Sequence, residues 1–193
     1  MPWTFPPLTD GRVRLEPLTE THREPLRAAA DDERIWTWNV SSGFGPHFDG
    51  WFAAATAETA AGTRAAFAVR TLADDRLVGS TSFLALAPAH KRLDVGHTWY
   101  VPDVWGTVVN PACKRLLLAH AFEVLGVNRA ALQTDLRNTR SQAAIAKLGA
   151  VREGVLRKHM VTHTGHVRDT VVFGITADDW PTVKARLDAR LAC

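Results

Sequence analysis

The chain has 193 residues, of which 46 % are hydrophobic and 22 % charged, a balance that is typical of a globular protein and excludes extensive disorder. No run of about 18 or more apolar residues occurs, so we expect no membrane-spanning helix, and the start at Met1 lacks the basic and apolar segments of a secretory signal. The formal net charge of +3 is modest, and the lysines and arginines are scattered, which argues against a nucleic-acid-binding protein.

The first half of the chain predicts one strand, two helical segments and then three further strands. Residues 11–18 alternate apolar and polar side chains, which is typical of a strand with one buried face. A helical pattern follows from residue 19 to about 40, the Gly/Ser/Pro-rich segment 41–50 predicts a loop, and a second helix is expected from residue 48 or 49 to about 61. The three further strands are predicted at residues 65–72, 77–87 and 93–101.

The second half begins with a helix whose ends are marked by the sequence. Asn110 can cap this helix, Pro111 suits its first turn, and Gly126 ends it. The elements that follow are a strand at 129–136, a short helix at 139–148, two strands at 151–163 and 166–175 joined by a hairpin turn at Thr164-Gly165, and a last helix capped by Asp178 or Asp179. The order β-α-α-β-β-β-α-β-α-β-β-α predicts a single domain over residues 1–193, in which a mixed sheet carries helices on both faces.

The turn before the helix at Asn110 is a candidate phosphate site. Residues Trp105-Gly106-Thr107-Val108-Val109-Asn110 place a run of backbone amides directly before a helix N-terminus, where unpaired N–H groups and a partial positive charge bind phosphate. The chain lacks the GxxxxGKS/T motif, which argues against a nucleoside triphosphatase. Most strand-to-helix turns bind nothing, so the interpretation of this turn depends on further motifs.

Together with further segments, this turn resembles the motifs of the GNAT acyltransferase superfamily, specifically its RimJ/RimL-type branch. The resemblance covers about residues 11–187. It implies an α/β, mixed α+β fold of three layers: a central, mostly antiparallel seven-stranded sheet with one splayed parallel strand pair, at 93–101 and 129–136, and helices on both faces. The matching residues are Asp94-Val95-Gly96-His97-Thr98-Trp99, Trp105 to Lys114, Asp135-Leu136-Arg137-Asn138-Thr139-Arg140-Ser141, Lys147-Leu148-Gly149-Ala150 and Glu153-Gly154-Val155-Leu156-Arg157.

The resemblance implies acetyl-CoA as co-substrate, bound between the two splayed strands, and no metal. The pyrophosphate would rest on the amides of the turn, and the pantetheine arm would pair with the strand end near Tyr100. The turn departs from the family pattern at Val108, where glycine is usual, although many relatives in this branch keep the Gly-Thr-x-x-Asn that occurs here. The implied cofactor-binding residues are Tyr100, Val101, Trp105, Gly106, Thr107, Val108, Val109, Asn110, Lys114, Asn138 and Ser141.

Transfer of an acyl group to an amine needs a proton acceptor for the amine and a donor near the leaving thiolate. Ser141 matches the serine that the family places near the CoA sulfur, and its alternative role is a helix cap. Asp94 is the predicted base, directly or through water, and its alternative role is an ion pair with arginine. His97 would face away from Asp94 unless the strand bulges, as it commonly does in this family. His159 is a third candidate base, and the choice stays open.

Three tryptophans flank a Gly-rich loop that helps to wall the acceptor site in the branch that the chain resembles. We assign Trp36 to that wall, and Trp38 and Trp51 to the hydrophobic core. The residues expected to contact the acceptor are Trp36, His97, Trp99 and His159.

Neither metal binding nor disulfide bonding is expected. His159, His163 and His166 look like a metal cluster, but four residues along a strand separate side chains by about 13 Å, so at most two of them could meet across the turn. Cys113 and Cys193 cannot build a disulfide framework, and we interpret both as structural or incidental, which is typical of a reducing cytoplasm.

We therefore expect a cytoplasmic N-acetyltransferase that moves the acetyl group of acetyl-CoA to a primary amine by direct attack within a ternary complex. The acceptor would be a protein N-terminus or a small molecule, and neither nucleic acid nor a membrane is expected as a partner. Two alternatives stay open: a catalytically silent acyl-CoA-binding regulatory module, and a transferase that uses a longer acyl-CoA. Relatives in this family often dimerise, so a homodimer is a further option.

Overall fold

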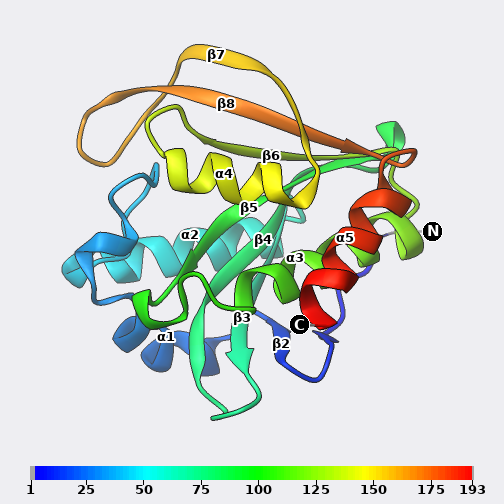
Figure 1. Cartoon of the computed structure of the whole chain (residues 1–193). Helices are drawn as coiled ribbons and strands as arrows, with labels where there is room; N and C mark the ends of the chain where they lie inside the picture. Colours follow the sequence, from blue (N-terminus) through cyan, green and yellow to red (C-terminus); the bar gives the residue numbers. More distant parts are fainter. Residues whose placement is uncertain (1–2, 193) are drawn as a thin grey trace.

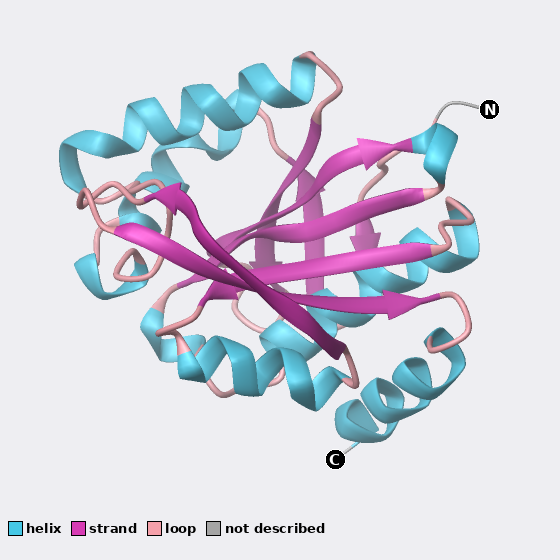
Figure 2. Cartoon of the chain, turned by 90° about the horizontal axis from the view of Figure 1, so that it is seen from above, coloured by secondary structure: helices cyan, strands magenta, loops and turns pink. Residues whose placement is uncertain are grey.

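The fold is one eight-stranded sheet with helices on both faces (Figures 1 and 2). The structure is a computed structural model that describes residues 3–192. Met1, Pro2 and Cys193 lie outside this range. The sheet confirms the predicted mixed α/β fold but has one strand more than the seven expected, because β1 pairs with β2; two residues are too few to show an alternating pattern. The strands are β1 (Leu8–Thr9), β2 (Val13–Pro17), β3 (Arg64–Thr71), β4 (Leu77–Ala87), β5 (Arg92–Tyr100), β6 (Arg129–Asp135), β7 (Val151–Val161) and β8 (Val167–Thr176).

Two hydrophobic clusters hold the helices, one on each face of the sheet. Because successive strand residues point to opposite faces, β3 contributes Phe67 to one cluster and its neighbours Ala66 and Ala68 to the other. The Phe67 cluster packs against α3 (Val109–Ala119), α4 (Thr139–Leu148) and α5 (Trp180–Ala192), and the Ala66 cluster packs against α1 (Arg23–Ala30) and α2 (Phe48–Ala60). Among residues 3–192, no helix combines the length and the hydropathy needed to cross a bilayer.

The strands β5 and β6 form the one parallel pair of the sheet, and they part soon after they meet. The strand order is β1-β2-β3-β4-β5-β6-β8-β7, and all other neighbours are antiparallel. The parallel register contains three pairs and ends at Asp94↔Ala131, although β5 continues to Tyr100 and β6 to Asp135. This geometry confirms the predicted splayed pair. The β6-facing backbone of β5 is therefore left without a strand partner beyond Asp94.

The helix predicted from residue 19 to about 40 is wrong in its extent. The segment instead forms two short 3-10 turns, Glu20–His22 and Glu33–Ile35, on either side of the eight-residue α1. At Asp32 the backbone is extended, and the Asp32 carboxylate accepts the Arg34 amide at 3.0 Å. Such a bond between a side chain and a nearby amide competes with continued helix. Residues 36–41 therefore run as a loop, and this loop borders the cavity described below.

The helix predicted around Asn110 begins earlier than expected and changes its form near its end. The first residue of α3 is Val109, and no side chain caps it, so Asn110 lies inside the first turn. A π-helical turn follows at His120–Val124. Gly126 then ends the element, as predicted, with a φ of 64° that favours glycine.

The hairpin of β7 and β8 turns where the sequence predicts, and its tip contacts the loop 36–41. The backbone amide of His163 donates to the Val40 carbonyl at 2.7 Å, and His163 Nε2 lies 3.1 Å from the Trp36 carbonyl oxygen. Figure 1 shows this hairpin reaching over toward the N-terminal part of the chain. The hairpin and the loop thus meet beside the gap between β5 and β6.

Candidate active site

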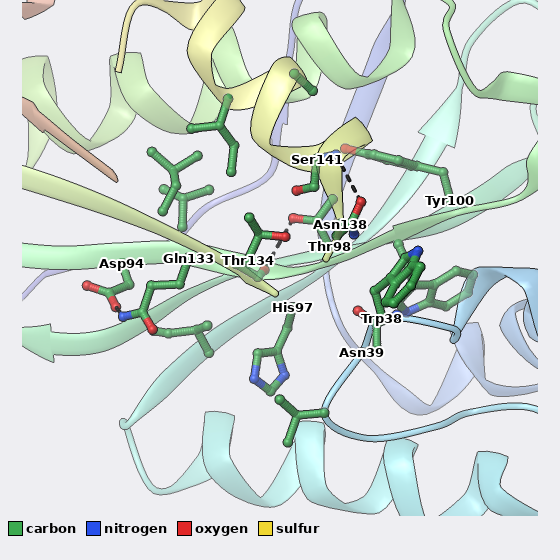
Figure 3. Close-up of a pocket in the computed structure, with 18 of the residues that line it drawn as sticks. Trp38, Asn39, Asp94, His97, Thr98, Tyr100, Gln133, Thr134, Asn138 and Ser141 are labelled. Carbon is green, nitrogen blue, oxygen red and sulfur yellow. Dashed lines mark hydrogen bonds between the residues drawn. The ribbon is translucent and has the colours of Figure 1, made fainter. Parts of the chain in front are cut away.

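A cavity of about 860 Å³ lies where β5 and β6 part (Figure 3). Its walls include β5 from Asp94 to Tyr100 and β6 from Leu132 to Thr134, together with parts of α2, α4, β7, β8 and the loop 36–41. Side chains from both faces of the sheet therefore border one continuous space. We call its two parts the α4 side, with Tyr100, Asn110, Lys114, Asn138 and Ser141, and the α2 side, with Trp36, Asp94, His97, Trp99 and Arg168.

The turn 105–110 leaves backbone amides free at the α4 side. Gly106 has a φ of 79°, a conformation that glycine adopts without strain. The amides of Trp105 and Thr107 donate to the carbonyls of Pro102 and Val104, whereas those of Gly106 and Val108 have no acceptor among residues 3–192. Free amides at the start of a helix attract anions. The predicted phosphate site therefore has the donors that it needs.

Most of the residues predicted to bind the cofactor face one space. Val109 is an exception because it packs into the hydrophobic core, and Thr107 is another because its hydroxyl donates to the Val104 carbonyl at 2.7 Å. Any contact from the residues outside the lining stays a prediction. The predicted residues that line the cavity are Tyr100, Trp105, Gly106, Asn110, Lys114, Asn138 and Ser141, and those that do not are Val101, Thr107, Val108 and Val109.

Ser141 and Asn138 meet at the start of α4. The Asn138 side chain accepts the Ser141 amide at 3.0 Å and caps the helix (Figure 3). The cap considered for Ser141 is therefore supplied by Asn138. The Ser141 hydroxyl has no hydrogen-bond partner in the described part of the chain, and the half-buried side chain borders the cavity. A hydroxyl in this position can donate to a ligand or accept from it.

Lys114 places a buried amine at the cavity wall. Its side chain, which projects from α3, is almost fully buried, and Nζ donates to Thr98 Oγ1 of β5 at 2.9 Å. Burial lowers the pKa of Lys114 to about 8, because the charged form is poorly solvated there. The amine is still mostly protonated at pH 7, so it adds positive charge to the cavity.

Asp94 lies at the point where β5 and β6 begin to part. Gln133 Nε2 of β6 donates to Asp94 Oδ2 at 2.8 Å, and among residues 3–192 no arginine forms an ion pair with Asp94. Burial raises the pKa of Asp94 and outweighs the Gln133 hydrogen bond and the more distant positive charges. A carboxylate with a raised pKa accepts protons more readily near neutral pH. The ion pair with arginine that was considered for Asp94 is absent.

His97 reaches the same cavity as Asp94 because the strand bulges. The register of β5 against β4 shifts by one residue around His97, whose φ is 46°. Such a bulge changes the face to which the following side chains point. The accessible surface of His97 faces the cavity, and burial, with the nearby charge of Arg64, lowers the pKa of His97 to about 4. The imidazole is therefore neutral at pH 7.

The tryptophans divide between the core and the cavity wall. Trp36, Trp51 and Trp99 are all nearly buried, with ring centroids 5.3 Å apart for Trp36–Trp99 and 5.5 Å for Trp51–Trp99, and all three border the cavity. The prediction that Trp38 lies in the core is wrong. Trp38 is half-buried and lines the cavity, and the Arg137 guanidinium lies 5.0 Å from its ring centroid. The acceptor role of Trp36 and Trp99 stays a prediction.

Three cavity residues were not singled out by the sequence. Arg140 lies over the Trp105 ring at 3.9 Å from its centroid, beside the turn with the free amides. Gln133 bonds Asp94 across the gap, and Arg168 enters the cavity from β8. Arg140 belongs to the motif that ends at Ser141, so that motif could have indicated it. No local pattern marks the other two.

The remaining candidates are His159, a metal site and Cys113. His159 lines the cavity from β7, and its Nδ1 lies 3.2 Å from Thr170 Oγ1. Within residues 3–192, no three His, Cys, Asp or Glu side chains group in a way that could hold a metal ion. Cys113 is fully buried, and burial raises the pKa of its thiol to about 12. The thiolate of Cys113 is therefore scarce at neutral pH.

Comparison with known proteins identifies the family. Residues 12–151 match the domain described as "Acetyltransferase (GNAT) domain". The chain is 30 % identical over 99 residues to the uncharacterized N-acetyltransferase YoaA of Bacillus subtilis (strain 168), in an alignment that covers 51 % of this chain and 55 % of YoaA. The chain thus spans little more than half the length of the curated relatives that it matches. The matched domain includes the turn, the parted strands and α4, and the chain belongs to the GNAT acetyltransferase family.

Solved structures match almost the whole chain. A structure from T. thermophilus, described as a candidate acetyltransferase, is 38 % identical, with a TM-score of 0.87 and coverage of 98 % of this chain and 99 % of that one. RimJ of Mycobacterium smegmatis, in complex with CoA-disulfide, is 22 % identical, with a TM-score of 0.79 and coverage of 95 % and 92 %. The likeness to RimJ shows a shared fold.

Proposed function

We propose that this chain is an acetyl-CoA-dependent N-acetyltransferase of the RimJ/RimL-type branch, acting on a primary amine of a peptide or a small molecule. The observation that carries the proposal is the cavity of about 860 Å³ at the parted strands, bordered by free turn amides on its α4 side. Family membership supports the chemistry, and the CoA-disulfide bound to RimJ, which has the same fold, supports the cofactor. Residues 1–193 would act as a single catalytic domain.

Acetyl-CoA, in this proposal, binds along the α4 side. The amides of Gly106 and Val108 donate to its pyrophosphate, and Lys114 contributes positive charge toward the polyanion. The pantetheine arm lies beside Tyr100 and Val101, because the β6-facing backbone of β5 has no strand partner there. This arrangement brings the thioester toward Ser141, whose hydroxyl is free to act on the sulfur.

The amine attacks from the α2 side. Its nitrogen forms a bond to the acetyl carbonyl carbon as the bond between that carbon and sulfur breaks. The amine proton passes to Asp94, directly or through water, while Ser141 donates a hydrogen bond to the departing thiolate. The thiolate then takes a proton from water, and Asp94 returns its proton to the resulting hydroxide. His97 and His159 are the alternative proton acceptors. Since the Cys113 thiol is buried and un-ionised, no acyl-cysteine intermediate is required.

The test is release of free thiol from acetyl-CoA by the purified chain. We expect turnover with at least one member of a panel of peptides, amino acids and polyamines, and CoA binding by calorimetry. Binding of CoA without turnover across the panel would favour the regulatory module, and turnover only with longer thioesters would change the donor. Absence of both binding and turnover would overturn the proposal.

A further inference from the structure

Arg168 is a buried cation without a partner in the wall of the cavity. It lies on β8, its residue surface is 7 % exposed, and it borders the cavity on the α2 side. Its Nε is fully buried with no hydrogen-bond partner, and within residues 3–192 its guanidinium forms neither an ion pair nor a side-chain hydrogen bond. A guanidinium stays protonated in proteins, and a buried cation without a counter-ion is strongly destabilising. The position therefore calls for an anion from outside the chain.

The carboxylates near Arg168 are engaged elsewhere. The charge of Asp135 acts on Arg168, but Asp135 accepts Nε and Nη2 of Arg137 at 3.1 and 2.9 Å. Glu58 pairs with Arg64 at 3.2 Å, and Asp94 is bonded to Gln133. The carboxylates of residues 3–192 thus leave the Arg168 charge without a direct partner.

A second buried guanidinium acts on the same region. The Arg64 side chain is 2 % exposed, and its Nη2 is buried without a partner although its other nitrogens bond Ser82 and Glu58. The charges of Arg64 and Arg168 lower the pKa of His97, whereas that of Glu58 raises it, so all three act on the part of the cavity where His97 lies. Because Glu58 pairs with Arg64, the charge left for an anion on the α2 side is that of Arg168.

We infer that the acceptor molecule carries a carboxylate as well as its amine, and that Arg168 binds this carboxylate. The inference rests on the proposed acyl transfer and specifies its substrate class. A guanidinium presents N–H donors in a planar fork that matches the two oxygens of a carboxylate. Binding the carboxylate at Arg168 would hold the acceptor by a group other than the amine, leaving the amine free to face the thioester. The carboxylate can come from a free amino acid or from an acidic side chain of a peptide.

The test compares matched acceptors with and without this carboxylate. Each pair is assayed with acetyl-CoA: phenylalanine against phenylalaninamide, β-alanine against its amide, and the dipeptide Ala-Glu-amide against Ala-Gln-amide. We expect kcat/KM for the carboxylate member of at least one pair to be about tenfold higher or more. A hydrogen bond to a charged group contributes enough binding free energy for a change of that size. Preference in the amino-acid pairs indicates a free amino acid, and preference in the dipeptide pair indicates an acidic peptide.

Variants connect the preference to Arg168. Arg168→Gln should reduce the ratio within the preferred pair to about twofold, whereas Arg168→Lys should retain part of it. Arg157→Gln on β7 is the matched control, because it removes the same charge from an exposed side chain outside the cavity, and it should leave the ratio unchanged. A wild-type protein that acetylates both members of every pair equally would overturn the inference while leaving acyl transfer intact.

If no acceptor turns over, the proposed function is contradicted. A binding measurement then tests whether Arg168 binds a carboxylate. Calorimetry of the CoA-loaded protein compares N-acetylphenylalanine with N-acetylphenylalaninamide, in the wild type and in Arg168→Gln. Binding of the carboxylate that is about tenfold tighter than that of the amide, and that is lost in the variant, would support the inference. Equal binding, or no binding of either compound, would overturn it. If Arg168→Gln does not fold, Arg168→Lys replaces it in this comparison.

Discussion

The two sides of the cavity differ in how far apart in the chain their residues lie. On the α4 side, the turn 105–110, Lys114 and the segment 138–141 form two short segments, one shortly after β5 and one shortly after β6. On the α2 side, the lining comes from separate segments between Ile35 and Arg168, brought together by the tryptophan packing and by the hairpin tip. The α4 side is therefore determined mainly by local structure, and the α2 side by tertiary packing.

The chemical character of the two sides differs in the same way. The α4 side offers unpaired amides and a free hydroxyl, which suit a ligand that is the same for every member of a family. The α2 side holds the buried charge of Arg168 and groups with shifted pKa values, namely Asp94 and His97, which respond to the identity of the acceptor. Substitutions on the α4 side should thus change turnover or cofactor binding, and those on the α2 side should change the pH profile and acceptor choice.

The largest effect is expected from Ser141→Ala. Loss of the hydroxyl should lower kcat on the order of 100-fold, since it removes a donor to the leaving sulfur, while the Kd for CoA changes by less than about threefold. Stability should be retained, because the Ser141 cap contact uses the backbone amide, which alanine keeps. Steady-state kinetics and calorimetry measure the two quantities. Thr139→Ala, an exposed change on the same turn of α4, is the control, and equal kcat in both variants would remove Ser141 from the mechanism.

The α4 side is also where the sequence predicts the site best. A turn that ends at a helix, and an Asn-x-x-Ser segment at the start of the next helix, specify their own geometry within a few residues, so Asn138 and Ser141 lie where the motif places them. The bulge at His97 was anticipated only through the family resemblance, because bulges depend on the partner strand. Arg168 and Gln133 had no signal, since their role arises only when β6 pairs with β5 and β8 pairs with β6.

The next largest effect is expected from Asp94→Asn, which tests whether the α2 side supplies the base. At pH 7 kcat/KM should fall about tenfold, because water can replace only part of the proton acceptance. In the wild type kcat/KM should rise with pH through a pKa above the ordinary aspartate value, since Asp94 must lose its proton to act. This rise should be absent in the variant. If instead the rise persists after Asp94→Asn and is absent after His97→Gln, His97 is the base.

Asp94→Asn, which should lower activity, should raise stability. A carboxyl whose pKa is raised in the folded state stabilises the fold only while protonated, so stability falls as pH rises from the unfolded value through the raised native value. The loss is complete once the pH exceeds the raised native value. Asp94→Asn keeps an acceptor for Gln133 without the buried charge, so the variant should melt at a higher temperature than the wild type at pH 7, and this advantage should disappear below about pH 4. A lower melting temperature at pH 7 would contradict the assigned burial effect.

The fold was predicted more fully than the site, and its errors have local causes. The mixed sheet follows from the element order, the hairpin from its turn residues and the parallel pair from the family resemblance, and the structure confirms all three. The long helix expected from residue 19 failed because a helical hydrophobic pattern does not show the bond from the Arg34 amide to Asp32 that interrupts it. Trp38 was misplaced for the same reason. Once that helix is broken, residue 38 lies in a loop beside the cavity rather than on a packed helical face.

The smallest effect is expected from a comparison of two glycines with open space around them, one in the α4-side turn and one outside the cavity lining. At Gly106 an added Cβ would meet nothing within 4 Å, but the φ of 79° disfavours any other residue. Gly106→Ala should therefore cost about 1 kcal/mol, lowering the melting temperature by about 3 °C. It should also weaken CoA binding about fivefold, because strain that is relieved by moving the turn displaces its free amides.

Gly50 provides the matched change. It lies in α2 with a helical backbone and also has nothing within 4 Å of an added Cβ. Gly50→Ala should stabilise the chain by about 0.5–1 kcal/mol and leave CoA binding unchanged, since alanine restricts the unfolded chain and suits a helix. Thermal unfolding and calorimetry on both variants separate backbone strain from loss of the site. If Gly106→Ala lowers the melting temperature and CoA still binds with its wild-type Kd, the turn amides do not hold the pyrophosphate, and the α4 side loses its distinguishing role.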